Sequence, residues 1–167
     1  MSRRYGVVTA KVKEVRDPQA EGRVKVSFDW MGDGAQGYWA PVASIMAGGD
    51  RGAWYMPEVG DEVLVAFEQG DVNHPYVVGF LHNGEQRPPE TDPQVRLLRS
   101  VNGHEIAIRD PDVVGGDTGG IRIEDAHGNV IELSNARITI TSVAQIEINA
   151  PAVIINGRPV APVPSPI

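Results

Sequence analysis

The chain has no cysteine among its 167 residues. Disulfide bonds and thiolate metal sites are therefore excluded, and the fold must be held together by burial and backbone pairing alone. No apolar run approaches the roughly 20 residues that span a bilayer, and segment 1–5 lacks the apolar stretch of a secretory signal peptide. We therefore expect synthesis in the cytoplasm without Sec-dependent export.

Positive charge and helical patterning are also scarce. The net charge is −7 and the isoelectric point about 5.0, whereas a nucleic-acid-binding surface usually needs a basic patch that neutralises phosphates. No stretch of a dozen residues keeps a 3.6-residue apolar period, and 19 glycines and 13 prolines separate short segments. Such punctuation is typical of β proteins. The sequence thus predicts an all-β fold and no nucleic-acid partner.

No recognisable catalytic or cofactor motif is present. The histidines, His74, His82, His104 and His127, show no i, i+2 or i, i+4 pairing, so we expect no metal or cofactor, although threefold symmetry could bring one histidine from each of three chains together. The glycine-rich segment 48–52 is not followed by the Gly-Lys-Ser/Thr of a phosphate loop, and no nucleophile elbow occurs. We expect no enzyme activity and no small-molecule substrate.

Residues 1–83 read as one barrel. Five strand-like runs cover 5–15, 23–28, 38–46, 62–68 and 76–81, and a glycine-rich loop follows the third. In the second run Val24, Val26 and Phe28 alternate with polar neighbours, as in a half-buried strand, and Pro41 interrupts the third. Five short strands with one long connection before the fourth predict a small closed barrel of the OB type. Segment 84–94, with three prolines and many polar side chains, is predicted to be a linker.

Beyond the linker, short strands carry pairs of apolar residues separated by one polar residue. Strands are predicted at 105–109 and 121–124, and from residue 130 the apolar pairs recur every seven to eight residues. The register of the last pair stays open, because Ile154 could face inward instead. The predicted inward residues are Ile131, Leu133, Ile138, Ile140, Ile146, Ile148, Val153 and Ile155.

Strands this short bury too little alone, and a single ribbon leaves both edges unpaired. Three identical ribbons wound about one axis would pair the edges and cover the aliphatic side chains. We therefore predict that residues 95–155 form an intertwined β-prism or β-helix in a homotrimer, although spacing alone does not fix the number three. Residues 156–167 hold four prolines and one charge, Arg158, and are predicted to end the strand stack as a segment capped by a partner.

The order of these motifs resembles a known family. The matching stretches are 23–30 (RVKVSFDW), 38–42, 57–71 (PEVGDEVLVAFEQGD), 75–83, 102–106 and 121–133 (IRIEDAHGNVIEL). They are similar to the central spike proteins of contractile injection systems, which include phage gpV-type baseplate assembly proteins and the VgrG spikes of type VI secretion. The resemblance implies a homotrimer whose OB-folds sit on a baseplate hub and whose β-helix is driven through the target membrane when a sheath contracts.

Several further expectations combine this resemblance with the residues themselves. The chain shows no hub domain of its own and no lysozyme-like insertion, so the hub is expected to be a separate protein within a phage-tail-like particle. No His-x-His pair is available to hold an apical metal, so a PAAR-type tip protein is expected on the C-terminal segment. Trp30, Trp39 and Trp54 are expected in the barrel core or in contacts with the hub or between subunits. The expected tip contacts are Asn156, Gly157, Arg158, Pro159, Val160 and Pro162.

The predicted function is that of a structural, non-enzymatic central spike of a phage tail, a tailocin or an extracellular injection system. Two other classes stay open. One is an OB-fold module that binds a single-stranded nucleic acid, which would leave the repeat after residue 130 unexplained. The other is a fragment of a trimeric tail fibre or adhesin, which would not need the OB motifs.

Overall fold

The computed structural model describes residues 3–32, 36–112 and 118–160, and it confirms the prediction of an all-β fold. The described residues contain strands and one short 3-10 helix, Glu68–Gly70, and no helix among them is long and apolar enough to cross a membrane. The chain divides into two compact units between Pro88 and Pro89, within the segment predicted to be a linker. Each unit is described by itself.

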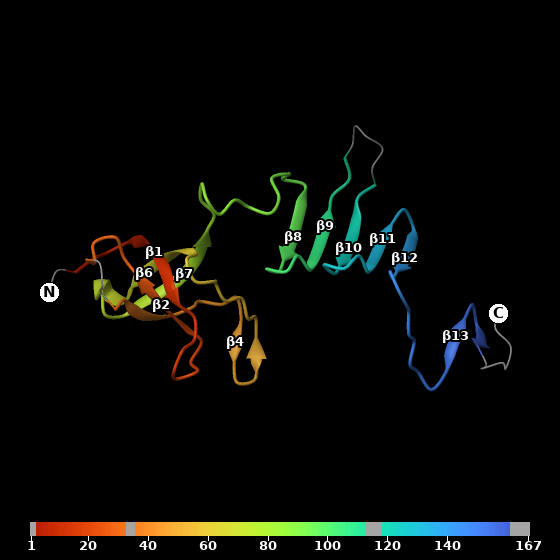
Figure 1. Ribbon diagram of the computed structural model, residues 1–167, viewed down its shortest axis with the longest axis horizontal. Helices are drawn as coiled ribbons and strands as arrows, with labels where there is room; N and C mark the ends of the chain where they lie inside the picture. The colour runs from red at the N-terminus through yellow and green to blue at the C-terminus, as the bar shows by residue number, and fades with distance from the viewer. Residues whose placement is uncertain (1–2, 33–35, 113–117, 161–167) are drawn as a thin grey trace. The chain divides into compact units, whose positions relative to one another are not determined.

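The first unit is a curled five-stranded antiparallel sheet (Figure 1). Its spatial order is β3-β2-β1-β6-β7, and a parallel bridge between Val42 and Val77 brings the end of β3 to β7. The Ala43 N–H donates to the Val77 carbonyl oxygen at 2.8 Å. This contact joins the two outer strands and curls the sheet towards the closed barrel expected of an OB-fold. The strands are β1 (Val7–Glu14), β2 (Arg23–Ser27), β3 (Tyr38–Pro41), β6 (Glu62–Phe67) and β7 (Pro75–Leu81).

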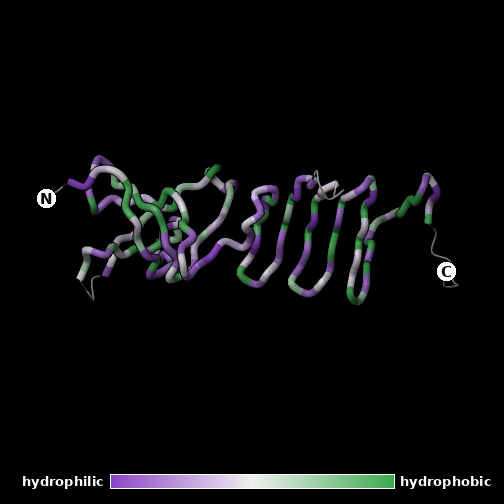
Figure 2. The backbone as a smooth tube through the Cα atoms, turned by 90° about the horizontal axis from the view of Figure 1, so that it is seen from above, coloured by the Kyte–Doolittle hydropathy of each residue, from purple (hydrophilic) through white to green (hydrophobic). Residues whose placement is uncertain are grey.

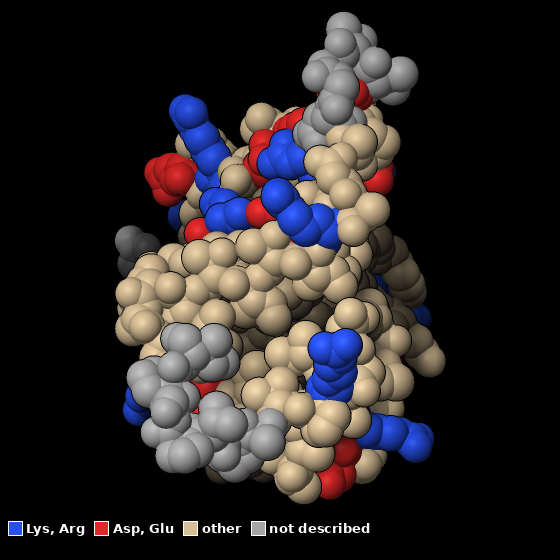
Figure 3. Space-filling model, turned by 90° about the vertical axis from the view of Figure 1, so that its right-hand side faces the viewer, with Lys and Arg blue, Asp and Glu red and all other residues tan. Residues whose placement is uncertain are grey.

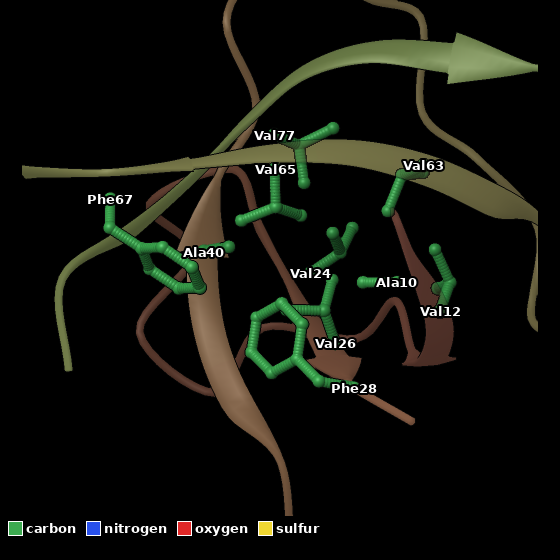
Figure 4. Close-up of a cluster of buried hydrophobic side chains, with 10 residues drawn as sticks. All are labelled: Ala10, Val12, Val24, Val26, Phe28, Ala40, Val63, Val65, Phe67 and Val77. Carbon is green, nitrogen blue, oxygen red and sulfur yellow. The ribbon is translucent and has the colours of Figure 1, made fainter. Parts of the chain in front are cut away.

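The barrel encloses its own hydrophobic core, which Figure 4 shows. Alternate residues of each strand point inward, as the period-2 pattern predicts. Phe28 and Phe67 lie with their ring centroids 5.3 Å apart. The buried core residues are Ala10, Val12, Val24, Val26, Phe28, Ala40, Val63, Val65, Phe67 and Val77. This unit therefore has a core that depends on no other chain.

A small hairpin replaces the glycine-rich loop predicted after the third strand. That strand ends at Pro41, and β4 (Ala47–Gly48) pairs with β5 (Arg51–Gly52). The prediction of a strand over 38–46 was thus too long, because proline cannot continue a ladder in which its N–H is needed. Asp50 takes a left-handed φ of +56° in the hairpin turn.

The second unit begins with an antiparallel meander in which each strand pairs with the next (Figure 1). Hydrophilic and hydrophobic residues alternate along these strands (Figure 2). Among the described residues of this unit, Ala107 is the only buried hydrophobic side chain, so the unit has almost no core of its own. The meander strands are β8 (Val95–Arg99), β9 (Glu105–Arg109), β10 (Gly120–Glu124), β11 (Val130–Ser134) and β12 (Arg137–Thr141).

Two local features of the second unit differ from the expectation. Ile146 and Ile148 were expected in a strand of the intertwined trimer, and segment 142–152 forms no strand within the single chain, so a strand that pairs with another copy stays a prediction. The proline-rich segment was expected to end the strands, but β13 (Val153–Ile155) pairs with β14 (Arg158–Val160). Proline is tolerated at position 159 because a two-stranded ribbon leaves one edge of each strand unpaired.

Candidate trimer interface

One face of the meander carries two columns of aliphatic side chains. Directly paired residues of antiparallel strands point to the same side of a sheet. In the observed register, Ile123 pairs with Ile106 on one side and Ile131 on the other, and Ile131 pairs with Ile140. The first column is Leu98, Ile106, Ile123, Ile131 and Ile140, and the second is Ile108, Ile121, Leu133 and Ile138.

All nine side chains of these columns are at least 37% exposed in the described part of the chain. Leu133 on β11 is 37% exposed, and the exposed fraction rises to 68% for Ile138 on the edge strand β12. Isolated exposed aliphatic side chains are ordinary, but a contiguous apolar patch spanning five strands marks an interaction surface. The aliphatic side chains of these strands can form a hydrophobic core, but only if a second surface packs against them.

The opposite face of the same sheet carries paired charges beside a few apolar residues, Leu97, Ala107 and Val130. Arg122 lies 2.8 Å from Glu124 and 3.4 Å from Glu132, and Arg99 pairs with Glu105. The hydrogen bond from Arg122 lowers the pKa of Glu124. Its ion pairs suit this face to water better than the face with the aliphatic columns, so the columns are the surface that needs a partner.

Tight turns hold the strands in register. Asn135 and Ala136 link β11 to β12 with φ angles of +50° and +58°, the left-handed pair of a two-residue type I′ hairpin. The Asp125 carboxylate accepts hydrogen bonds from the backbone N–H of His127 and Asn129. Its hydrogen bond from the Asn129 side chain is the main reason that the pKa of Asp125 falls to about 2. Since a one-residue slip would move every aliphatic residue to the polar face, these turns preserve the two columns.

The structure brings together four of the eight predicted inward residues, Ile131, Leu133, Ile138 and Ile140. Sequence reasoning missed the members on β8, β9 and β10, although the same alternation over 105–109 and 121–124 could have identified most of them. Ile146 lies with Ile123, Ile131 and Ile140 around a hollow of about 380 Å³.

The remaining predicted residues lie outside the meander. Ile148 is exposed and belongs to no strand. Val153 and Ile155 share one face of the β13–β14 hairpin, and Ile154 takes the other. Ile154 and Ile155 are equally exposed, at 66% and 64%, so the single chain does not distinguish which of them faces inward.

The predicted tip contacts cluster at the end of the same hairpin. Asn156 and Gly157 form its turn with φ angles of +50° and +75°, and Arg158, Pro159 and Val160 form β14. The Asn-Gly dipeptide is the strongest sequence signal for such a turn. Pro162 lies outside the described residues.

The three tryptophans have different surroundings. Trp30 stacks on Phe28 at a centroid distance of 4.5 Å, and the Arg4 guanidinium lies 4.0 Å from its ring centroid. Trp39 is half-buried on β3, beside the cationic ends of Arg23 and Lys25. Trp54 is the most exposed of the three. Two of these rings are therefore engaged within their own chain, and Trp54 is the one that offers most of its surface.

The histidines do not assemble a metal site within the part of the chain that the structure describes, where no group of three potential ligands occurs. His104 and His127 approach each other with ring centroids 6.1 Å apart. The Ala126 N–H donates to His104 Nδ1 at 3.2 Å, so this nitrogen acts as an acceptor.

On the face shown in Figure 3, basic and acidic side chains are interspersed without a broad basic area.

Comparisons with known proteins agree with this arrangement. Residues 8–82 match the type VI secretion system/phage-baseplate injector OB domain, and residues 95–160 match the phage baseplate V C-terminal trimerisation domain. The type VI secretion system spike protein VgrG5 of Pseudomonas aeruginosa is 36% identical over 126 residues, or 73% of this chain and 15% of that protein.

Two further relatives match shorter stretches. VgrG2a of Pseudomonas aeruginosa, another spike protein, is 35% identical over 88 residues, which cover 50% of this chain and 10% of the relative. The actin cross-linking toxin VgrG1 of Vibrio cholerae is 34% identical over 77 residues, which cover 44% of this chain and 7% of the toxin. The chain thus spans less than a fifth of the length of these relatives.

An injector OB domain followed by a trimerisation domain defines a class of spike component. The chain belongs to the baseplate central spike family of contractile injection systems. The predicted family and the predicted OB-fold are confirmed, and the β-helix within the C-terminal domain stays a prediction.

Proposed function

We propose that this chain forms the homotrimeric central spike of a contractile injection machine and acts mechanically. The observation that carries the proposal is the uncovered aliphatic face of the meander, which lies within a domain of the trimerisation family. Three copies that direct this face towards a common axis would bury both columns. The paired charges of the opposite face would stay in water.

Segment 142–152 supports interlocking of the three chains. It contains the Ile146–Ile148 pair in the same apolar-polar-apolar pattern as the strands, but lacks a strand partner in its own chain. The edge strand β12 offers unpaired backbone groups. If this segment paired with β12 of a neighbouring copy, the segment would gain a strand partner and the backbone groups at the edge of β12 would be hydrogen-bonded. An exposed strand edge is a template for such pairing. The result would be the intertwined β-prism.

The proposed partners lie at the two ends of the chain. The OB barrel is proposed to sit on a separate baseplate hub protein, and the β13–β14 hairpin to hold a PAAR-type tip protein. The turn residues Asn156 and Gly157, together with exposed Val160, support a tip contact because they belong to a compact hairpin with few charges. The assembled spike would contact the target membrane by being driven through it, as part of a phage-tail-like particle.

No enzymatic step is included in this proposal. The cross-linking activity in the name of the Vibrio cholerae relative is a property of a protein of which the matched residues form 7%. Turnover of a substrate by the purified chain would contradict the non-enzymatic part of the proposal.

Light scattering after size exclusion tests the proposal directly. A mass near 54 kDa, three times the 18.0 kDa chain, is the expected result. A stable 18 kDa species would refute the trimeric spike. In that case a single-chain OB-fold binding module would explain the protein better. A 54 kDa species that binds no baseplate component would instead favour a trimeric tail fibre or adhesin.

A further inference from the structure

Three asparagines of this chain stand directly before a glycine, namely Asn83, Asn102 and Asn156. Asparagine is a thermolabile residue, and this dipeptide is especially labile because glycine has no side chain to hinder attack of its backbone nitrogen on the asparagine carboxamide. The attack is slowed when the fold holds the carboxamide or engages the glycine nitrogen in a hydrogen bond. Since the local chemistry of the three sites is the same, the structure decides which of them reacts.

The carboxamide of Asn83 is held at both of its polar atoms. Its Oδ1 accepts hydrogen bonds from the backbone N–H of Glu85 and Gln86 at 2.9 and 2.7 Å. Its Nδ2 donates to Glu62 Oε2 at 2.9 Å, and the residue is partly buried. The carboxamide therefore cannot turn towards the Gly84 nitrogen without breaking these bonds.

At Asn102 the attacking nitrogen itself is engaged. The Gly103 N–H donates to the Ser100 carbonyl oxygen at 2.9 Å, and the Ser100 N–H donates to the His104 carbonyl oxygen at 2.8 Å. The His104 N–H in turn donates to Ser100 Oγ at 3.0 Å. These bonds close the turn between β8 and β9, so the nitrogen must leave a hydrogen bond before it can attack.

Asn156 has neither form of protection. Asn156 and Gly157 are the turn residues between β13 and β14, and both are exposed. Among the described residues, no hydrogen-bond partner reaches the Asn156 carboxamide or the Gly157 N–H. A Cβ placed on Gly157 would meet no described atom within 4 Å. Both reacting groups are therefore open to solvent.

The hairpin around Asn156 also opens more easily than the other two sites. Attack requires the Gly157 nitrogen to reach the Asn156 carboxamide carbon, which needs a departure from the closed turn. The β13–β14 hairpin is a two-stranded sheet with three residue pairs, and an isolated hairpin of this kind is marginally stable in water. Its local opening therefore costs little free energy, whereas Asn83 and Asn102 directly follow or link strands of five-stranded sheets.

We propose that Asn156 is a site of spontaneous deamidation, which modifies the C-terminal hairpin as the protein ages. The Gly157 nitrogen bonds to Asn156 Cγ, the Cγ–Nδ2 bond breaks, and the amide nitrogen leaves as ammonia with the proton that the Gly157 nitrogen gives up through solvent. Water then opens the resulting succinimide at either carbonyl group, which yields aspartate or isoaspartate.

Both products change the hairpin. Each carries a new negative charge, which offsets that of Arg158, the charged residue of β14. Isoaspartate also routes the main chain through the former side chain and adds a carbon atom to it, so the two-residue type I′ turn is lost. The modification does not depend on the trimer; its effect on a tip contact rests on the proposed function.

Peptide mapping by mass spectrometry tests the site in the full-length chain. The protein is incubated at mildly alkaline pH, once folded and once in urea, and the conversion of each asparagine is followed over time. In urea the three sites should react at similar rates, because each precedes a glycine. In the folded protein Asn156 should keep most of that rate, while Asn83 and Asn102 should react severalfold more slowly than in urea.

Asn156→Gln is the matched variant, because a glutamine must close a larger ring and reacts much more slowly. It should remove most of the acidic species that ion exchange first separates from the folded parent protein. Protection of Asn156 as strong as that of Asn83 or Asn102, or an earlier reaction at either of them, would overturn the proposal. Light scattering tests the trimer separately, so a failure here is distinguishable from a failure of the proposed function.

Discussion

Replacement of Ile140 by asparagine isolates the trimer contact from the fold of the single chain. Ile140 lies on the edge strand β12 and is 58% exposed there, so its loss removes little from the packing of one chain. Complete burial of an isoleucine contributes about 1.5–3 kcal/mol. Covering the part that is still exposed is therefore worth about 1–2 kcal/mol in each chain.

The amide adds a second cost in the proposed interface. Burying a polar group without a partner costs about 1–3 kcal/mol in proteins, which brings the loss to about 2–5 kcal/mol per chain and about 6–15 kcal/mol per trimer. Because each 1.4 kcal/mol is a factor of ten, the trimer dissociation constant should rise by about four orders of magnitude or more. Sedimentation equilibrium over a concentration series measures this change.

Thr139→Asn is the matched control. Thr139 is one residue away on the same strand, but it pairs with Glu132 on the polar face. The substitution introduces the same side chain without changing the net charge. It should leave the trimer intact, and circular dichroism of both variants should show that the strands persist. If Ile140→Asn dissociates no more readily than Thr139→Asn, the assignment of the apolar face to the trimer interface is wrong.

Three more local features give measurable predictions. Ala136 has a φ of +58°, so Ala136→Gly should raise the free energy of unfolding by up to about 1 kcal/mol, and an unchanged or lower melting temperature would contradict this strain. Val65 is completely buried, so Val65→Ala should cost about 1–3 kcal/mol in chemical denaturation while the oligomeric mass stays constant. Hydrogen bonds from Arg23 hold the pKa of Asp17 well below its ordinary value. The stability that Asp17 contributes is therefore complete above pH 4 and is lost as the pH falls towards the lower, folded-state pKa. Asp17→Asn should lower the melting temperature at pH 7 and weaken its dependence on acid, and an unchanged acid profile would argue against this role.

The barrel could be predicted well from the sequence because its strands alternate apolar, inward-facing residues with polar, outward-facing ones. Val24, Val26 and Phe28 alternate with polar residues, and all three lie in the core. The β4–β5 hairpin could not be predicted, because it depends on the Ser44 hydroxyl and a left-handed Asp50. Such short elements carry no hydrophobic period.

The candidate interface could be predicted only in part. The repeat after residue 130 indicated the pairs on β11 and β12, because each pair follows a tight turn. Strand β8 was not predicted, because two adjacent leucines, Leu97 and Leu98, interrupt the alternation of apolar and polar residues. Ile146 and Ile148 follow the same pattern as the strands but form none in the single chain. Periodicity records which residues are suited to a strand, and pairing decides whether the strand forms.

The two units differ in what holds them together, and this difference bears on how a spike could be assembled. The barrel buries ten core residues within one chain, whereas the described part of the second unit buries one hydrophobic side chain. The stability of the second unit is therefore tied to association and to chain concentration. Once three copies associate, breaking the assembly would require the aliphatic columns to return to water together, and the barrier to that step protects the structure kinetically. A rod that transmits force needs such a barrier along its axis, and placing the core between the chains rather than within each of them provides it.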